Sequence, residues 1–163
     1  PTHSQMKQRF SKLPAKERQW VAGQIDCAAQ FVDAFSESDA GQPLTLAALD
    51  RAFAAWLGTQ EADNQLVNGA INCVGIAFGQ FLVDGAGLNW VIATDQNGCD
   101  LAVHGHPGKG DVLIYPANFV AKRWERRETH FLEASYQQIV DQVQNVKLAA
   151  PSAAEQRPWW KLW

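Results

Sequence analysis

The chain has 163 residues, of which 47% are hydrophobic and 19% charged, and its formal net charge is −3 at pH 7. This composition predicts one globular domain with a sizeable core and excludes a disordered chain, and the negative charge argues against nucleic acid as the partner. Cys27, Cys73 and Cys99 are odd in number and widely spaced. This pattern favours a reducing compartment, the cytoplasm, over a disulfide framework. We see no apolar run long enough to span a membrane.

The N-terminal third predicts helices. Residues 1–13 are polar, with a few apolar residues at helical spacing, and predict a short helix. Pro14 suits the first turn of a longer helix, whose amphipathic stripe runs as far as Phe35. Thr45 has the side chain of a helix N-cap, and the helix that it starts is expected to continue to about Leu57.

A third helix is expected over residues 63–83, and it contains several glycines. Gly69, Gly75 and Gly79 are set among large apolar residues. Each glycine costs a helix about 1 kcal/mol relative to alanine. Their number indicates close backbone approach by a neighbouring helix or by the sheet, with a ligand against the glycines as the alternative. This helix is expected to be central to the fold.

The next segment predicts a β-hairpin. Residues 88–94 are expected to alternate between two faces, with the larger apolar residues Leu88, Trp90 and Ile92 on one of them, and Asn97 and Gly98 then favour a two-residue type I′ turn. That turn places Leu101 opposite Thr94, so that the apolar faces of both strands agree.

A third strand over residues 111–115 completes an antiparallel meander, and Pro116 ends it. Asn118 and Thr129 are candidate N-caps for two further helices. The predicted fold class is therefore α+β: N-terminal helices, a three-stranded antiparallel meander, then C-terminal helices packed on the sheet.

The last residues differ in composition from the rest. We expect a single domain over residues 1–148, followed by a linker and a Trp-rich tail over residues 149–163. The tail carries Trp159, Trp160 and Trp163. Tryptophan is enriched at interface anchors. The tail is therefore predicted either to cover a groove on its own domain or to dock into a partner or a second copy.

Two stretches resemble a known family: GIAFGQFLVDGAGLNWVIATDQNGCDLAV and YPANFVAKRWERRE. Over roughly residues 62–146 the chain resembles the bacterial domain of unknown function 3806. The residues that carry this resemblance are Gly75, Gly79, Trp90, Asp95, Gly98, Pro116, Lys122, Arg123, Glu125 and Arg126. Arg127 departs from the family, which favours glycine there. The resemblance implies a bacterial source and the α+β arrangement, and it supplies no reaction.

Three polar residues of the hairpin form one candidate site. In the expected register Asp95 and Asp100 face each other, and His104 lies further along the same face. Such a set is typical of a metal or acid–base site. The alternative is that Asp95 bonds to the backbone of the turn while Asp100 is solvated or paired with an arginine.

A second candidate is a basic cluster on the helix after the sheet: Lys122, Arg123, Arg126 and Arg127. Such a cluster can grip an acidic partner or a phosphate. Glu125 and Glu128 interrupt it, which equally fits a solvated helix face with ion pairs between neighbouring turns.

These features favour a non-enzymatic protein-binding module of bacterial origin, either an immunity-type or an accessory protein that occludes a specific partner. The expected contacts are the tail tryptophans and the basic cluster, and the partner is another protein or a second copy. We expect no cofactor, metal, nucleic acid or membrane. The alternative is a small metal-dependent or acid–base enzyme that uses Asp95, Asp100 and His104.

Overall fold

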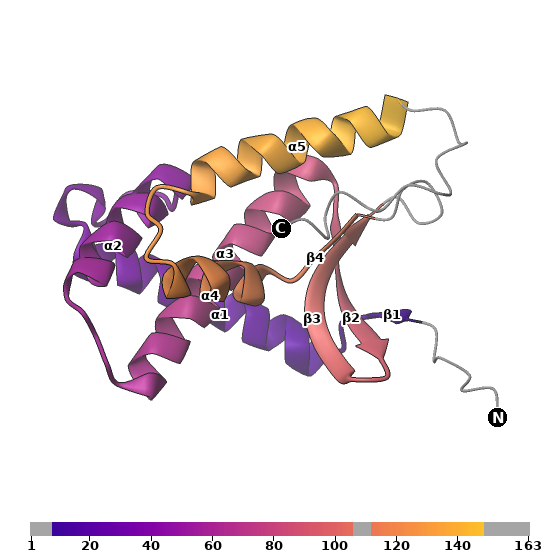
Figure 1. The fold of residues 1–163 in the computed structure, drawn as a ribbon, viewed down its shortest axis with the longest axis horizontal. Coiled ribbons are helices and arrows are strands. Elements are labelled where there is room, and N and C mark those ends of the chain that lie inside the picture. The colour runs from indigo at the N-terminus through magenta and orange to yellow at the C-terminus, as the bar shows by residue number, and fades with distance from the viewer. Residues whose placement is uncertain (1–7, 106–111, 149–163) are drawn as a thin grey trace.

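The computed structural model describes residues 8–105 and 112–148, and the described part is an α+β fold, as predicted. Five α-helices lie to one side of a four-stranded antiparallel sheet (Figure 1). A short 3-10 turn, Glu37–Asp39, follows the first helix. The elements in chain order are β1 (Arg9–Lys12), α1 (Ala15–Phe35), α2 (Leu46–Gly58), α3 (Asn64–Ala86), β2 (Asn89–Asp95), β3 (Gly98–Gly105), β4 (Val112–Ile114), α4 (Pro116–Glu125) and α5 (Leu132–Leu148).

The sheet has the order β1-β2-β3-β4, so the predicted meander is present and a fourth strand, β1, is added at its edge. The helix predicted over residues 1–13 is therefore wrong for its described part. Residues 9–12 are extended and pair with β2, from Arg9 opposite Thr94 to Lys12 opposite Val91. Pairing with a distant strand overrides the weak local helical pattern.

The hairpin register differs from the prediction by two residues. Asp95 pairs with Gly98, so the turn residues are Gln96 and Asn97. The Asp95 carboxylate accepts a hydrogen bond from the backbone N–H of Asn97 at 2.7 Å, which stabilises the earlier turn. Because a shift of two preserves the alternation of side chains, the predicted faces still hold.

The central helix is α3, and Gly75 and Gly79 are packing sites, as predicted. The prediction is wrong for Gly69, which is exposed and has nothing within 4 Å of a methyl group placed on it. A methyl group at Gly75 would lie 2.6 Å from Cα of Ala117 in α4. Gly79 lies against the Trp90 ring, and Gly85 lies against the Tyr136 hydroxyl of α5. Glycine thus lets α4, β2 and α5 approach the α3 backbone.

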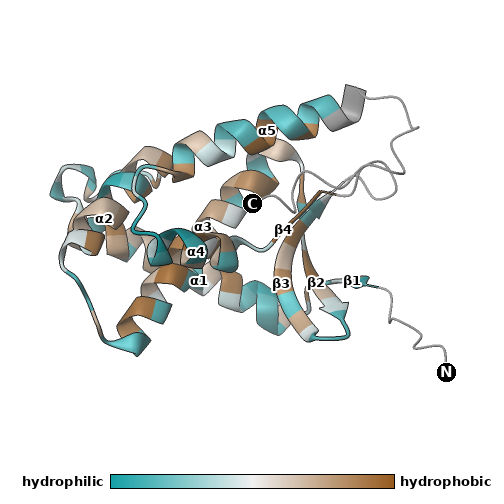
Figure 2. Ribbon diagram, in the orientation of Figure 1, coloured by the Kyte–Doolittle hydropathy of each residue, from teal (hydrophilic) through white to brown (hydrophobic). Residues whose placement is uncertain are grey.

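By length and composition, α3 is also apolar enough to cross a bilayer, contrary to our sequence expectation. Most of its apolar window is buried inside the fold, and the core helix of a soluble protein passes the same test. Figure 2 shows the hydrophobic colouring of α3 and the hydrophilic colouring along much of α5.

The two helix starts after the sheet were predicted incorrectly. Asn118 lies inside α4, which begins at Pro116 because proline suits the first helical turn. Thr129 precedes α5, whose first backbone N–H groups are instead capped by the carboxylate of Asp50 in α2. This cap comes from a distant part of the chain, so no local pattern reveals it. By contrast, Thr45 caps α2 as predicted.

Position 127, where the family resemblance leads us to expect glycine, lies at the break after α4. The N–H of Arg127 donates to Trp124 and that of Glu128 to Arg123, which is the Schellman arrangement of a helix end. Arg127 has a φ of +58°, in the left-handed region. The basic helix therefore ends sharply even though an arginine stands at this position.

Glycine at the left-handed ends of α2 and α4 should stabilise the fold. Gln60, which follows α2, has a φ of +56°. We expect Gln60→Gly to raise the free energy of unfolding by about 1 kcal/mol, because an L-residue is strained in this conformation. Arg127→Gly should raise the free energy of unfolding by less, because it also removes a guanidinium that lies 5.1 Å from the Trp124 ring centroid. Urea denaturation of both variants checks this order, and a larger gain at Arg127 would contradict it.

Candidate functional site

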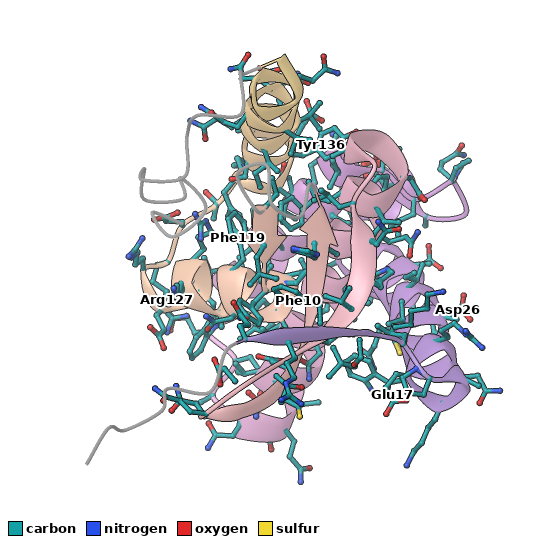
Figure 3. The ribbon with its side chains drawn as sticks, turned by 90° about the vertical axis from the view of Figure 1, so that its right-hand side faces the viewer. Phe10, Glu17, Asp26, Phe119, Arg127 and Tyr136 are labelled. Atoms are coloured by element: carbon teal, nitrogen blue, oxygen red, sulfur yellow. The ribbon has the colours of Figure 1, made fainter. Side chains whose placement is uncertain are left out.

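An open apolar groove lies where the end of β1, α1 and α3 meet the inner face of β2. Its volume is about 350 Å³. The lining residues are Lys12, Leu13, Arg18, Val21, Ala22, Ile25, Gln80 and Trp90. In Figure 3, α1 lies beside the end of β1, with Glu17 and Asp26 labelled on it.

The groove is supported by a small hydrophobic cluster. Leu13, Val21 and Ile76 are buried there, and Ile25 and Trp90 pack against them while staying partly exposed. The amphipathic stripe of α1 therefore has two roles. Its buried residues hold the helix to the sheet, and its half-exposed residues form the groove wall.

Trp90 is held in one orientation. Its indole Nε1 donates a hydrogen bond of 2.9 Å to Oε1 of Gln80, and the Gln80 amide donates one of 3.0 Å to Asp84. Its ring lies on Gly79, where no side chain can intervene. A partly exposed tryptophan that is fixed in this way is a preorganised contact surface.

The groove rim is basic although the whole chain is acidic. Lys12 and Arg18 line it, and no acidic residue does. Within the described residues, neither side chain forms an ion pair. Arg9 and Lys16 add positive charge to the same short segment. Sequence reasoning missed this site because it assigned residues 1–13 to a helix, but the concentration of cations between Arg9 and Arg18 was a usable signal.

The hairpin candidates do not converge on one point. Asp100 pairs with Ala93 and not with Asp95, and its carboxylate accepts the N–H of Leu101 at 2.8 Å. His104 is four residues further along β3, on the order of 13 Å at the usual rise per residue. The local interpretation of Asp95 is therefore correct. Within the described ranges, no group of three or more His, Cys, Asp or Glu side chains could hold a metal ion.

His104 instead belongs to the outer face of the sheet. Its ring stacks on Phe10 of β1, with centroids 4.0 Å apart. The small residues Ala93 and Ala102 are buried on this face together with Leu113. Figure 3 shows β1 running in front of the other strands, with Phe10 labelled beside it. Gln8, just before β1, donates to the Tyr115 hydroxyl at 2.9 Å.

The basic cluster is divided by the fold. Lys122, Arg126 and Arg127 are exposed, whereas Arg123 is only 7% exposed. Its guanidinium lies 3.5 Å from the Phe119 ring centroid and donates to the Phe119 carbonyl. Burial lowers the pKa of Arg123. Arg123 is thus part of the α4 packing, and the three exposed cations are Lys122 on α4 and Arg126 and Arg127 directly after it.

The cysteines and the tail complete the sequence candidates. Cys73 is buried, and burial raises the pKa of its thiol to about 12, which leaves almost no thiolate at neutral pH. Cys27 and Cys99 are exposed free thiols. Trp159, Trp160 and Trp163 lie outside the described residues.

A second hollow of about 630 Å³ lies between α2 and α5, near Asp50, Arg51 and Glu133. Asp50 and Arg51 in its wall already bond to other residues of the fold. Arg51 makes a bidentate pair with Asp39, at 2.7 and 2.8 Å. Hydrogen bonds from Arg51 and then Ser36 lower the pKa of Asp39 to about 2. The pair therefore stabilises the fold above the ordinary pKa of 3.8, and this contribution is lost as the pH falls through about 2.

Comparison with known proteins gives one match. The match is to the family described as Domain of unknown function (DUF3806), and it covers residues 52–136. No curated protein and no solved structure matches the chain. The matched span contains α3, the hairpin and α4, together with the glycine contacts described above. Because the match covers just over half of the chain, this protein belongs to the DUF3806 family.

Proposed function

We propose that this protein is a non-enzymatic protein-binding module that uses the groove beside Trp90. The observation that carries the proposal is a tryptophan that is fixed by Gln80 and Gly79 yet left partly exposed in an apolar groove. An aromatic side chain that loses little freedom on binding is a good interface anchor.

Two neighbouring features support this proposal. Trp20 on α1, next in sequence to the groove residue Val21, is 44% exposed. Large apolar side chains at the surface around a groove are typical of interaction sites. The charged rim adds specificity, because Lys12 and Arg18, which form no ion pair among the described residues, favour an acidic surface.

We further propose that the module acts in a bacterial cytoplasm, as an immunity-type or accessory protein that occludes one partner. Three free cysteines fit a reducing compartment. The family resemblance implies the bacterial source. Protein partners, including a second copy, fit the groove chemistry better than nucleic acid, since the chain has a net charge of −3.

Affinity capture from the native lysate tests the proposal when groove variants are compared with matched controls. We expect one stoichiometric partner on the wild-type chain. Ala22→Trp, which fills the groove from an exposed position on α1, should reduce its capture at least about tenfold by blocking the anchor pocket. Ala29→Trp makes the same change at an exposed position on α1 that does not line the groove.

Two outcomes would contradict the proposal. Capture of no partner by the wild-type chain would argue against a binding module. A partner that is kept by Ala22→Trp but lost by Lys122→Glu combined with Arg126→Glu would move the interface to α4. A chain that ends at Ala150, run in parallel, reports whether residues 151–163 contribute.

A further inference from the structure

We infer that the groove binds an acidic, extended segment of a partner protein, which inserts one apolar side chain against Trp90. This inference rests on the proposed function and specifies the chemistry of the partner. It combines three separate features of the site: its size, its charge and the strand at its border.

The size of the groove suits one or two side chains. Small-molecule sites usually span roughly 300–1,000 Å³, and this groove of about 350 Å³ is at the lower limit. It is also open along one side, so a small ligand would stay largely exposed to water. A peptide that anchors one side chain here and continues along the surface has no such disadvantage.

The charge of the rim selects the acidic partner. Lys12 and Arg18 stand at the groove without an ion pair among the described residues, and Arg9 and Lys16 are close in sequence. A carboxylate on either side of the apolar anchor would reach these cations and form charge-assisted hydrogen bonds. A basic segment would be repelled.

The neighbouring strand favours an extended segment. β1 is the first strand in the sheet order, and on its other side it pairs with no described strand. All four of its residues are exposed. Such an edge offers backbone hydrogen bonds to an added strand, and Lys12 connects that edge directly to the groove.

The chain's own tail is a poor match for this site. Residues 149–163 contain Arg157 and Lys161 against the single acidic residue Glu155. A second copy offers a better match at the start of α3, where Leu66 is 60% exposed near Glu61 and Asp63. However, the Asp63 carboxylate there already accepts the N–H groups of Gln65 and Leu66, so it is less available to the cations of the groove. A separate partner is therefore the occupant that we propose.

Selection from a displayed library of random dodecapeptides tests the inference with the full-length chain as bait. We expect the enriched peptides to carry an apolar or aromatic residue flanked by Asp or Glu. One enriched peptide, labelled with fluorescein, should lose affinity at least about tenfold in Lys12→Glu combined with Arg18→Glu, and also in Ala22→Trp. Its affinity should fall with added salt.

Matched controls carry the same chemical changes away from the groove. Lys122→Glu combined with Arg126→Glu repeats the charge reversal on α4, and Ala29→Trp repeats the bulky substitution on α1. Both should bind the labelled peptide within about twofold of the wild-type chain. Circular dichroism of each variant confirms that it is folded.

Several results would overturn the inference. These are no enrichment, enrichment of neutral or basic peptides, or an affinity that the groove variants leave unchanged. Self-association of the wild-type chain that Leu66→Asp abolishes would assign the groove to a second copy. If lysate capture still yields a groove-dependent partner in these cases, the proposed function stands and only the partner chemistry is wrong.

Discussion

Asp50→Ala should lower the free energy of unfolding by about 2 kcal/mol, because one buried and one partly buried helix N–H group lose their acceptor. The two oxygens of Asp50 accept hydrogen bonds from Leu132 at 2.9 Å and from Glu133 at 3.1 Å. Asp50 is only 6% exposed, so water cannot easily replace it. The carboxylate also lies at the positive end of the α5 dipole.

Asp63 provides the matched control. Its carboxylate also accepts two N–H groups, from Gln65 and Leu66, at the start of α3, but it is exposed. Asp63→Ala should cost about 1 kcal/mol, since water can solvate the freed groups. Urea unfolding of both variants checks this prediction. If the slope m is unchanged, the shift of the midpoint gives the change in the free energy of unfolding. If Asp50→Ala costs no more than Asp63→Ala, burial does not strengthen the long-range cap.

The second large effect is expected at Gly75, where alanine should destabilise the fold by roughly 3 kcal/mol. The added methyl group would lie 2.6 Å from Cα and 2.9 Å from N of Ala117. These are backbone atoms of α4, so relief requires the whole helix to move. The gain in helix propensity, about 1 kcal/mol, is too small to offset this.

Gly69→Ala should have the opposite sign in the same helix. A methyl group there meets no described atom within 4 Å. Only the propensity gain remains, and the free energy of unfolding should rise by about 0.5–1 kcal/mol. Thermal unfolding of Gly75→Ala and Gly69→Ala compares their effects on stability. If both variants change the free energy of unfolding in the same direction, α4 does not constrain α3 at Gly75.

Local signals allowed much of the fold to be predicted. The Thr45 cap, the apolar stripe of α1 and the alternation of residues 88–94 each depend on neighbours in sequence, and the structure confirms them. Gly75 and Gly79 of α3 were correctly interpreted as packing positions, because a costly residue in a helix often has a spatial reason, whereas Gly69 has none. The partners of Gly75 and Gly79 in α4 and β2 could not be named.

The incorrect predictions share a physical cause, which is a contact between residues far apart in sequence. Asp50 caps a helix that begins 82 residues later, and β1 takes its conformation from β2. Arg123 was assigned to an exposed cluster because charge suggests solvent, but Phe119 offers its guanidinium an aromatic face. The groove depends on the same distant pairing, so its residues were dispersed among separate sequence features.

The edge position of β1 also affects when the groove forms during folding. Its pairing with β2 closes a loop of roughly eighty residues, whereas the β2–β3 hairpin closes across two. Contacts between such distant segments form late in folding, and an exposed edge strand opens readily in the native state. The groove wall contributed by Lys12 and Leu13 therefore exists only in the completed fold, so nascent or partly unfolded chains lack the proposed binding surface.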